Sequence, residues 1–366
     1  MRLSTTLSVY IGRHFAVGFL TVFAVLMVLI LMFDAVELMR RAAARPEIGL
    51  GLVLKMTFLK LPHMGQQAFP FAALLGGMLV FWRLTRNHEL VVTRAAGVSA
   101  WQFLLPVLVI AFVLGVFNVT VTNPLASALL ARYERLQSDL FRGQGSTLAF
   151  SDAGLWLRQG GTNGQAVVHA ASMVQQKREV TLRDVIVFMY EGADRFIGRI
   201  DAEQAGLEDG FWHLRNAWVM APEKSAHFEK EYWVETDLTL GKIQDSFSPP
   251  DTMSFWALPG FIRTLQAAGF SALRHRLHFH ALLATPLLMC AMILIAATFT
   301  LRHARRGGTT VVIACGAMAG FLLYFFSDVV FALGLSDGIP VTLAAWTPSG
   351  VATLLGLAML LHLEDG

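Results

Sequence analysis

Apolar positions along the chain gather into six long runs, three on each side of a more polar middle section. The first three runs are Phe15–Phe33, Leu61–Trp82 and a span near Trp101–Val121, and the last three are Leu277–Leu301, Thr309–Ser327 and Gly338–Leu363. A helix crosses a membrane when about 20 mostly apolar residues, rising about 1.5 Å each, cover roughly 30 Å of hydrocarbon. The pattern therefore predicts an α-helical membrane protein with three plus three transmembrane helices.

The middle section has the shorter period that is typical of β-strands. Runs rich in Val, Ile, Phe, Trp and Tyr cover Ala166–Ala171, Val180–Tyr190 and Phe211–Met220, and further strands are expected at Arg195–Glu203 and Glu231–Leu240. No long helical period interrupts these runs, which predicts an all-β sandwich or jelly roll. The segment Met253–Gly269 is predicted to be a helix that leads back to the membrane.

The distribution of charge supports the same division. Residues 131–280 hold 16 of the 29 Lys and Arg residues and 18 of the 26 Asp and Glu residues. The whole chain is 55% apolar and 15% charged, whereas soluble domains are about 45–50% apolar and about 25% charged. We therefore expect transmembrane helices at 1–131 with a cytoplasmic helix at about 84–97, a jelly-roll-like domain outside the membrane at 132–270, and transmembrane helices at 271–366.

Basic residues in the short loops predict the orientation, because cytoplasmic loops carry an excess of Lys and Arg. With a cytoplasmic N-terminus, the arginines inside are Arg2, Arg13, Arg83, Arg86, Arg94, Arg302, Arg305 and Arg306. Arg40, Arg41 and Arg45 then lie outside, with Lys55 and Lys60 near the same side. The count favours cytoplasmic N- and C-termini, although Arg40 and Arg41 run against the trend.

No enzyme motif is complete in the sequence. The pair Gly241-Lys242 lacks the upstream glycine and the following Ser or Thr of a P-loop, and Val92 occupies the place of the second His after His88-Glu89. The histidines at 275, 278 and 280 have no evident carboxylate or thiolate partner and are interpreted as interface residues. We therefore expect a non-catalytic chain without a cofactor or metal. A net charge of +3 gives no reason to expect nucleic-acid binding.

Charged residues at the end of the first run are informative because charge is costly in lipid. Glu37, Arg40 and Arg41 are three and four positions apart and therefore share one helix face. They form either a helix end with a local ion pair or a basic patch that holds anionic headgroups of the outer leaflet. The stretch Arg83–Gly97 also has two interpretations: a plain surface helix, or a helix that docks into a partner's groove.

Several motifs occur in the order and spacing of a known family. They are Phe69–Gly76, Glu89–Val92 with Ala96-Gly97, Gly154–Trp156, Gly338–Pro340 and Ala345–Pro348. Together with three plus three spans around a β domain, they make the sequence resemble the LptF/LptG permeases of lipopolysaccharide export from about Tyr10 to the last span. Two of the motifs, Glu89–Val92 and Gly154–Trp156, are more similar to the LptG branch.

The resemblance implies an inner-membrane permease subunit of an ABC transporter, with the jelly-roll-like domain in the periplasm. Such a subunit extracts lipopolysaccharide from the outer leaflet and passes it to a periplasmic bridge. The implied partners are an LptF-type permease in a heterodimer, a dimeric LptB-type ATPase that hydrolyses ATP in trans, and LptC. A membrane scaffold or a secondary transporter subunit with a periplasmic β domain is the alternative function.

The resemblance also implies roles for individual residues. Glu89, Leu90 and Gly97 would belong to the helix that couples the permease to the ATPase. Arg40 and Arg41 match basic positions that contact lipopolysaccharide phosphates, and His63 and Phe69 are expected at the substrate. A basic position of the family falls at Asp34, which reverses the charge there.

Overall fold

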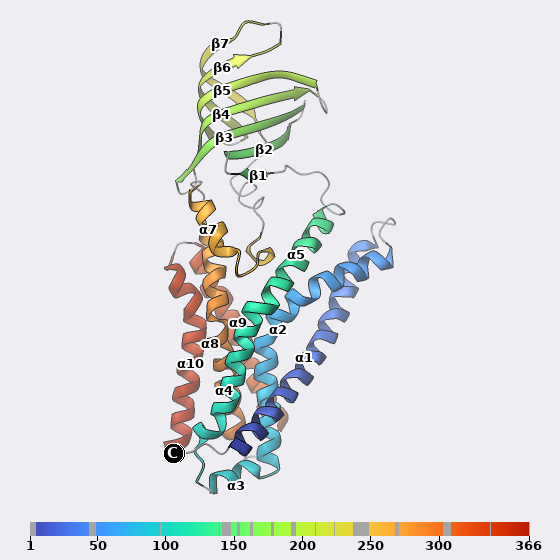
Figure 1. Cartoon of the computed structure of the whole chain (residues 1–366), viewed down its shortest axis with the longest axis vertical. Coiled ribbons are helices and arrows are strands. Elements are labelled where there is room, and N and C mark those ends of the chain that lie inside the picture. Colours follow the sequence, from blue (N-terminus) through green and yellow to red (C-terminus); the bar gives the residue numbers. More distant parts are fainter. Residues whose placement is uncertain are drawn as a thin grey trace. The chain divides into compact units, whose positions relative to one another are not determined.

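The computed structural model divides the chain into two units, which are drawn in Figure 1. It describes residues 5–43, 49–95, 97–138, 140, 148–151, 154–161, 164–176, 179–191, 195–208, 210–222, 224–236, 249–267, 271–302, 309–336 and 338–365. The helical unit comprises Met1–Glu134, Asp251–Leu258 and Leu273–Gly366, and the β unit comprises Arg135–Pro250 and Pro259–Ala272.

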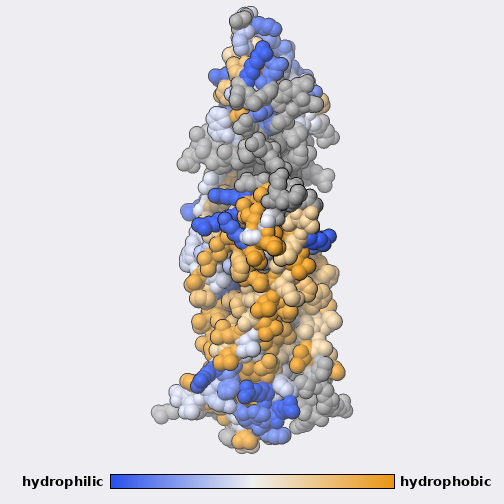
Figure 2. Space-filling view, turned by 90° about the vertical axis from the view of Figure 1, so that its right-hand side faces the viewer, coloured by the Kyte–Doolittle hydropathy of each residue, from blue (hydrophilic) through white to orange (hydrophobic). Residues whose placement is uncertain are grey.

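Six segments of the helical unit are long and apolar enough to cross a membrane, which confirms the predicted spans within the described residues. They are α1 (Thr5–Ala42), α2 (Leu50–Arg86), Ala100–Gln137, α8 (Leu273–Arg302), α9 (Thr309–Leu335) and α10 (Val341–Asp365). The third span combines α4 (Ala100–Phe117), the π-helix η1 (Asn118–Thr122) and α5 (Asn123–Gln137), and the short helix α3 (Glu89–Ala95) follows α2. Hydrophobic residues cover the middle of this unit in Figure 2, and hydrophilic residues gather at its α3 end.

Proline interrupts the hydrogen bonding of four spans, because its ring nitrogen has no proton to donate. The interrupting residues are Pro62 and Pro70 in α2, Pro106 in α4, Pro286 in α8 and Pro348 in α10. Pro70 leaves the Gln66 carbonyl without its usual helical donor, and Asn118 Nδ2 on η1 donates to that oxygen at 3.4 Å. The π-helix therefore supplies a polar side chain where α2 is broken.

Two glycine positions are explained by close helix packing. A Cβ on Gly76 of α2 would lie 2.9 Å from the Phe19 Cα of α1, so a side chain there would push the two backbones apart. Gly320 of α9 also faces α2, where a Cβ would meet Leu74 Cδ2, the end of a side chain that can shift. Small residues thus let α1 and α9 approach α2 closely.

The spans differ in how much of their apolar surface the chain itself covers. In the most apolar 18-residue stretch of α2, 61% of the residues are buried inside the chain. The corresponding share is 17% in α1 and 17% in α9. The core of the helical unit is built from α1, α2, α4 and α8, with Phe15, Phe81 and Leu104 almost fully buried. The remaining apolar faces of α1 and α9 are open to lipid or to another protein.

The β unit is a single antiparallel sheet in which the described strands follow sequence order. The strands are β1 (Leu148–Ser151), β2 (Gly154–Gly161), β3 (Gly164–Gln176), β4 (Glu179–Glu191), β5 (Arg195–Glu208), β6 (Phe211–Met220) and β7 (His227–Glu235). Helix α7 (Leu258–Ala267) packs Leu265 against the core of the sheet, where Trp212 is fully buried.

The predicted β insert is therefore confirmed as an antiparallel β region, but its described strands do not cross over as those of a jelly roll do. A jelly roll joins two sheets through Greek-key connections. Here each described strand pairs with the next one along the chain, and Gly210, between β5 and β6, has a positive φ of 83° that suits glycine. The result is a meander.

Candidate functional site

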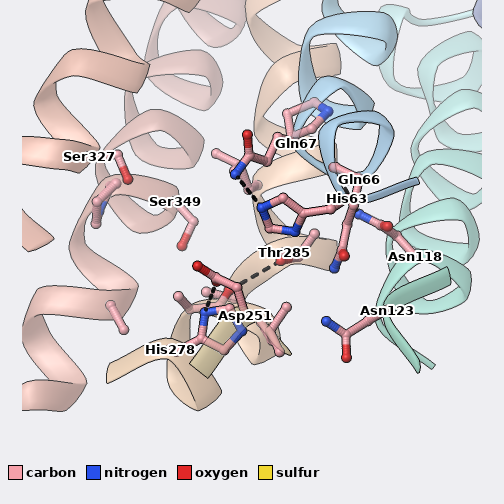
Figure 3. Close-up of a pocket in the computed structure, with 17 residues that line it drawn as sticks. His63, Gln66, Gln67, Asn118, Asn123, Asp251, His278, Thr285, Ser327 and Ser349 are labelled. Carbon is pink, nitrogen blue, oxygen red and sulfur yellow. Dashed lines mark hydrogen bonds and ion pairs between the residues drawn. The ribbon is translucent and has the colours of Figure 1, made fainter. Parts of the chain in front are cut away.

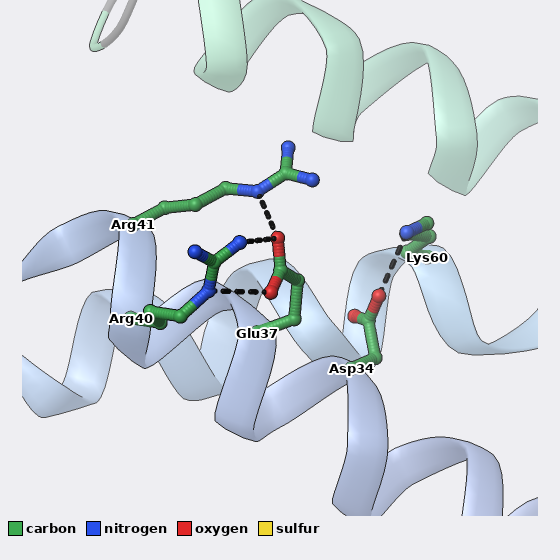
Figure 4. Close-up of polar contacts among 5 residues, drawn as sticks. All are labelled: Asp34, Glu37, Arg40, Arg41 and Lys60. Atoms are coloured by element: carbon green, nitrogen blue, oxygen red, sulfur yellow. Dashed lines mark hydrogen bonds and ion pairs between the residues drawn. The ribbon is translucent and has the colours of Figure 1, made fainter.

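Two ion-paired groups lie near the end of α1 that is away from α3, and we call them together the ion cluster (Figure 4). One group is formed by Glu37, Arg40 and Arg41, and the other by Asp34 and Lys60. Glu37 accepts hydrogen bonds from Arg40 Nε and Nη2, both at 2.9 Å, and from Arg41 Nε at 2.7 Å. The Arg40 side chain is 75% exposed, and an ion pair in such a position contributes little to stability because water and salt screen it. Because a guanidinium has about five N–H donors, Glu37 orients both arginines and leaves donors for a ligand.

The second ion pair of the cluster joins α1 to α2. Lys60 Nζ lies 2.7 Å from Asp34 Oδ1, and both side chains are largely covered. The Lys60 ammonium also lies 5.8 Å from the ring centre of Tyr133 on α5. Asp34, where the resemblance led us to expect a basic residue, is therefore paired with a lysine from the neighbouring helix.

The ion cluster as a whole is positively charged. The carboxylates of Asp34 and Glu37 face three cations, those of Arg40, Arg41 and Lys60. The structure therefore agrees in part with both interpretations of the α1 end. A local ion pair is present, as the first interpretation requires, and an excess of positive charge remains for the second. Arginine suits phosphate because its planar fork binds two oxygens at once and keeps its charge.

A polar cavity of about 270 Å³ lies inside the helical unit (Figure 3). Side chains from α2, η1, α5, α8, α9 and α10 line it, together with Asp251 of the return segment. Its amide side chains are those of Gln66, Gln67, Asn118 and Asn123, and its hydroxyls those of Thr285, Ser327 and Ser349. Pro70 and Pro348 also line it, so the cavity lies where two spans are interrupted.

Hydrogen bonds fix several of the polar side chains in this cavity. His278 Nδ1 lies 3.2 Å from Asp251 Oδ1, and Gln67 Nε2 lies 3.2 Å from His63 Nε2. The Asn123 side chain accepts from the backbone N–H of Phe255 at 2.7 Å, which holds the return segment Asp251–Leu258 against the third span. The cavity therefore has polar walls whose side chains are held in place, and all of them belong to the helical unit.

The two substrate residues predicted on α2 lie in different surroundings. His63 lines the polar cavity. Phe69 is buried in an aromatic cluster, with its ring centre 5.5 Å from that of Phe19 and 5.0 Å from that of Phe23. In this structure Phe69 holds α1 against α2, so a direct contact with substrate would require these helices to separate.

Helix α3 begins at Glu89, at the end of the helical unit where α1 starts. The turn before it contains His88, whose φ of 60° lets the chain reverse. Glu89 Oε2 accepts a hydrogen bond from the Tyr10 hydroxyl at 3.0 Å, and Oε1 accepts one from Asn87 Nδ2 at 3.1 Å. A carboxylate at a helix N-terminus also interacts favourably with the backbone dipoles.

The other predicted coupling residues position α3 in different ways. Leu90 is 5% exposed and belongs to the core of the helical unit, so it anchors the helix. Gly97 has a φ of 86°, a conformation that ends the helix and that other residues adopt only with strain. Val92 faces outward and is 67% exposed, which leaves an apolar side chain on the outer side of α3.

Sequence reasoning missed the partners that come from distant segments. The sequence puts Lys60 near the outer side without indicating its partner, and no sequence motif includes Asp251. For the polar cavity, the prolines of α2 and α10 are the signal that the sequence offers. A proline inside a span leaves a backbone carbonyl without its helical donor, so a polar side chain is expected nearby. Within the described residues, no group of three or more His, Cys, Asp or Glu side chains is placed to hold a metal ion.

Comparison with known proteins agrees with the sequence motifs. A family described as "Lipopolysaccharide export system permease LptF/LptG" matches residues 9–362. The LptG protein of Haemophilus influenzae is 25% identical over 360 residues, covering 94% of this chain and 95% of that protein. The LptG protein of Escherichia coli K12 is 26% identical over 315 residues, covering 84% of each chain. The resemblance predicted from the motifs, including its LptG character, is confirmed.

Proposed function

Since the chain belongs to the LptF/LptG family of lipopolysaccharide export permeases, we propose that it extracts lipopolysaccharide from the outer leaflet of the inner membrane and passes it to a periplasmic bridge. Its relatives are named as permease proteins of lipopolysaccharide export. The observation that carries the substrate assignment is the ion cluster, whose cationic excess lies at one end of a span with an open apolar face. An amphiphile with phosphates and acyl chains fits that combination.

The chain works with partners in this proposal. A dimeric LptB-type ATPase hydrolyses ATP in trans, an LptF-type permease forms the heterodimer, and LptC receives the lipid. The absence of a P-loop from the sequence agrees with an ATPase in trans. The small buried share of α1 and α9 agrees with a second membrane chain beside them.

Helix α3 is the docking element for the ATPase. Glu89 is held by Tyr10 and Asn87, and Val92 presents an exposed apolar side chain. A short helix with one oriented carboxylate and one outward apolar residue fits a groove with a basic rim and an apolar floor. In this assignment the α3 end is cytoplasmic, and the ion cluster and the β unit are on the periplasmic side.

The test is purification of the tagged chain from its native membrane with identification of the bound proteins by mass spectrometry. We expect a second permease and an ATPase in stoichiometric amounts. Val92→Asp should lose the ATPase and keep the second permease, whereas Lys224→Asp, on the exposed surface of the β unit, should keep both. Purification of the chain alone would contradict the permease complex and favour a scaffold or a secondary transporter.

A further inference from the structure

Helix α9 carries a single charged residue in its apolar part. Asp328 is the one charged residue between Ile313 and Leu335, the stretch of α9 that is long and apolar enough to cross a membrane. At about 1.5 Å per residue, it lies about 10 Å from the Leu335 end of that stretch. Its side chain is exposed, and no Lys, Arg or His that the structure describes forms an ion pair with it. Charged residues within spans nearly always pair with another group, because charge is costly in lipid. A partner for Asp328 therefore has to come from beyond these residues.

Asp328 belongs to a regular row of exposed residues, which we call the α9 seam. Its members follow one another at alternating steps of three and four positions. They are Met318, Phe321, Phe325, Asp328, Ala332 and Leu335, and all of them are exposed. Such steps average about 3.5 residues, the spacing that keeps a row of side chains facing a second helix packed alongside. The α9 seam thus has the pattern of a helix-packing face.

The opposite face of α9 packs within the helical unit. A Cβ on Gly316 would meet the side chain of Met78 on α2, and one on Gly320 would meet that of Leu74. At about 100° per residue, Phe325 lies about 140° around the helix from Gly320. The small residues of α9 therefore serve contacts inside the chain, and the α9 seam is left for another molecule.

The carboxylate indicates what kind of molecule covers the α9 seam. Acyl chains offer a carboxylate neither a counter-charge nor a hydrogen-bond donor, whereas a neighbouring helix with a Lys, Arg or His offers both. One polar residue in an otherwise apolar row also fixes how two helices align, because any shift leaves that residue unpaired. Asp328 between Phe325 and Ala332 is such a residue.

We propose that the α9 seam packs against a transmembrane helix of the second permease, and that a basic side chain of that helix pairs with Asp328 and sets the register. The inference rests on the proposed function, which places a second permease beside this chain, and it adds the chemistry of the contact. Phe321 and Phe325 supply the apolar surface, and the ion pair selects the partner helix and its alignment. A left-handed crossing of about 20° is the geometry that this spacing favours.

The experiment uses the purified complex that holds both permeases, with a photoreactive diazirine side chain in place of Phe321 or of Leu322. These neighbours are 59% and 58% exposed, but they lie about 100° apart around α9, and Leu322 is outside the α9 seam. Mass spectrometry identifies the crosslinked molecule and residue. We expect the Phe321 probe to label one helix of the second permease at least about tenfold more than the Leu322 probe, which should label lipid. The labelled helix should carry a Lys, Arg or His within about two turns of the labelled residue.

Substitutions of Asp328 then test the ion pair with the Phe321 probe in place. Asp328→Lys should lower the crosslinking yield by more than about tenfold, and reversal of the partner's cation to Glu should restore it. Asp328→Leu keeps the seam apolar, so the second permease should still co-purify. Its crosslinks should spread over several neighbouring residues of the partner helix, because the residue that sets the register is gone. A residue that only fills space would leave the labelled position unchanged.

Other outcomes separate the inference from the function on which it rests. In a complex that holds the second permease, equal labelling by both probes would overturn the α9 seam and leave the permease assignment standing. Labelling by Phe321 of lipid, of lipopolysaccharide or of another copy of this chain would do the same. A labelled helix without a basic residue, or unchanged crosslinking in Asp328→Lys, would overturn the ion pair. Purification of the chain without a second permease would overturn both the inference and the proposed function.

Discussion

Lys60 on α2 lies with its Nζ atom 2.7 Å from Oδ1 of Asp34 on α1. The two residues are 26 positions apart in the sequence, and their side chains are 26% and 11% exposed. The pair neutralises a largely covered acidic group and at the same time joins the first two spans. Its partial burial places its value between that of exposed and fully buried pairs.

Lys60→Met should lower the melting temperature of the purified complex, because Asp34 would be left covered without a cation. The cost lies between the about 0–1 kcal/mol of an exposed pair and the about 3–5 kcal/mol of a broken buried pair. Asp34→Asn added to Lys60→Met should restore part of the stability. Lys55→Met, an exposed lysine of the same helix, is the control. Equal melting temperatures for Lys60→Met and the control would show that the pair contributes nothing.

Reversing the arginines of the ion cluster should abolish phosphate binding. Arg40→Glu with Arg41→Glu replaces two cations by two carboxylates, which repel phosphate. Lipopolysaccharide crosslinking to a photoreactive diazirine side chain in place of Met39, an exposed residue of α1, should therefore fall more than about tenfold. Glu37→Gln, which removes the internal acceptor of both arginines, should keep or raise the crosslinking. Crosslinking per assembled complex that survives the double reversal would leave Arg40 and Arg41 with a purely local role.

Helix α3 offers a test of coupling to the ATPase. Glu89→Lys should weaken ATPase association by more than about tenfold, which corresponds to about 1.4 kcal/mol. Tyr10→Phe removes only the hydroxyl that holds Glu89 Oε2, so it should lower lipid-stimulated ATPase activity while the ATPase still co-purifies. The measurements are the amount of bound ATPase and the rate of ATP hydrolysis with and without lipopolysaccharide. Normal transport by the Glu89→Lys complex would remove the coupling role.

Gly76 should tolerate no side chain. A Cβ there would lie 2.9 Å from Phe19 Cα and 3.0 Å from Phe19 N, and backbone atoms cannot move aside as a flexible side chain does. Gly76→Ala should therefore lower the melting temperature. Gly51→Ala in the same helix is the matched control, because a Cβ at Gly51 meets nothing within 4 Å. It should be neutral or stabilising by about 0.5–1 kcal/mol, the helix preference of Ala over Gly. Identical responses would contradict the close α1–α2 packing.

Cysteine labelling of intact cells tests the proposed orientation. After replacement of Cys290 and Cys315 by Ala, a membrane-impermeant maleimide should label a cysteine at Lys224 in the β unit but not one at Arg86, at the end of α2. Both positions are exposed, so lack of labelling reports sidedness. Permeabilised cells should label both. Labelling at Arg86 alone in intact cells would reverse the topology.

Features that depend on neighbouring residues in the chain can be found from the amino-acid sequence alone. The six spans follow from runs of apolar side chains, and the helix after α2 follows from a charged stretch closed by Gly97. The strands follow from β-branched and aromatic runs, and the shared face of Glu37, Arg40 and Arg41 follows from helix geometry alone. Hydrophobic period and side-chain spacing are local properties, so one sequence is enough to find them.

Contacts between side chains that are far apart in the sequence depend on how the whole chain packs. The pairing of Asp34 with Lys60, the bond from Asn118 to the carbonyl freed by Pro70, and the meeting of His278 with Asp251 join segments 26, 52 and 27 positions apart. The order of strands in the sheet and the burial of Phe69 and Leu90 were decided in the same way. Each depends on how helices and strands pack. Packing is fixed by the fit of many surfaces at once, so no local pattern in the sequence records it.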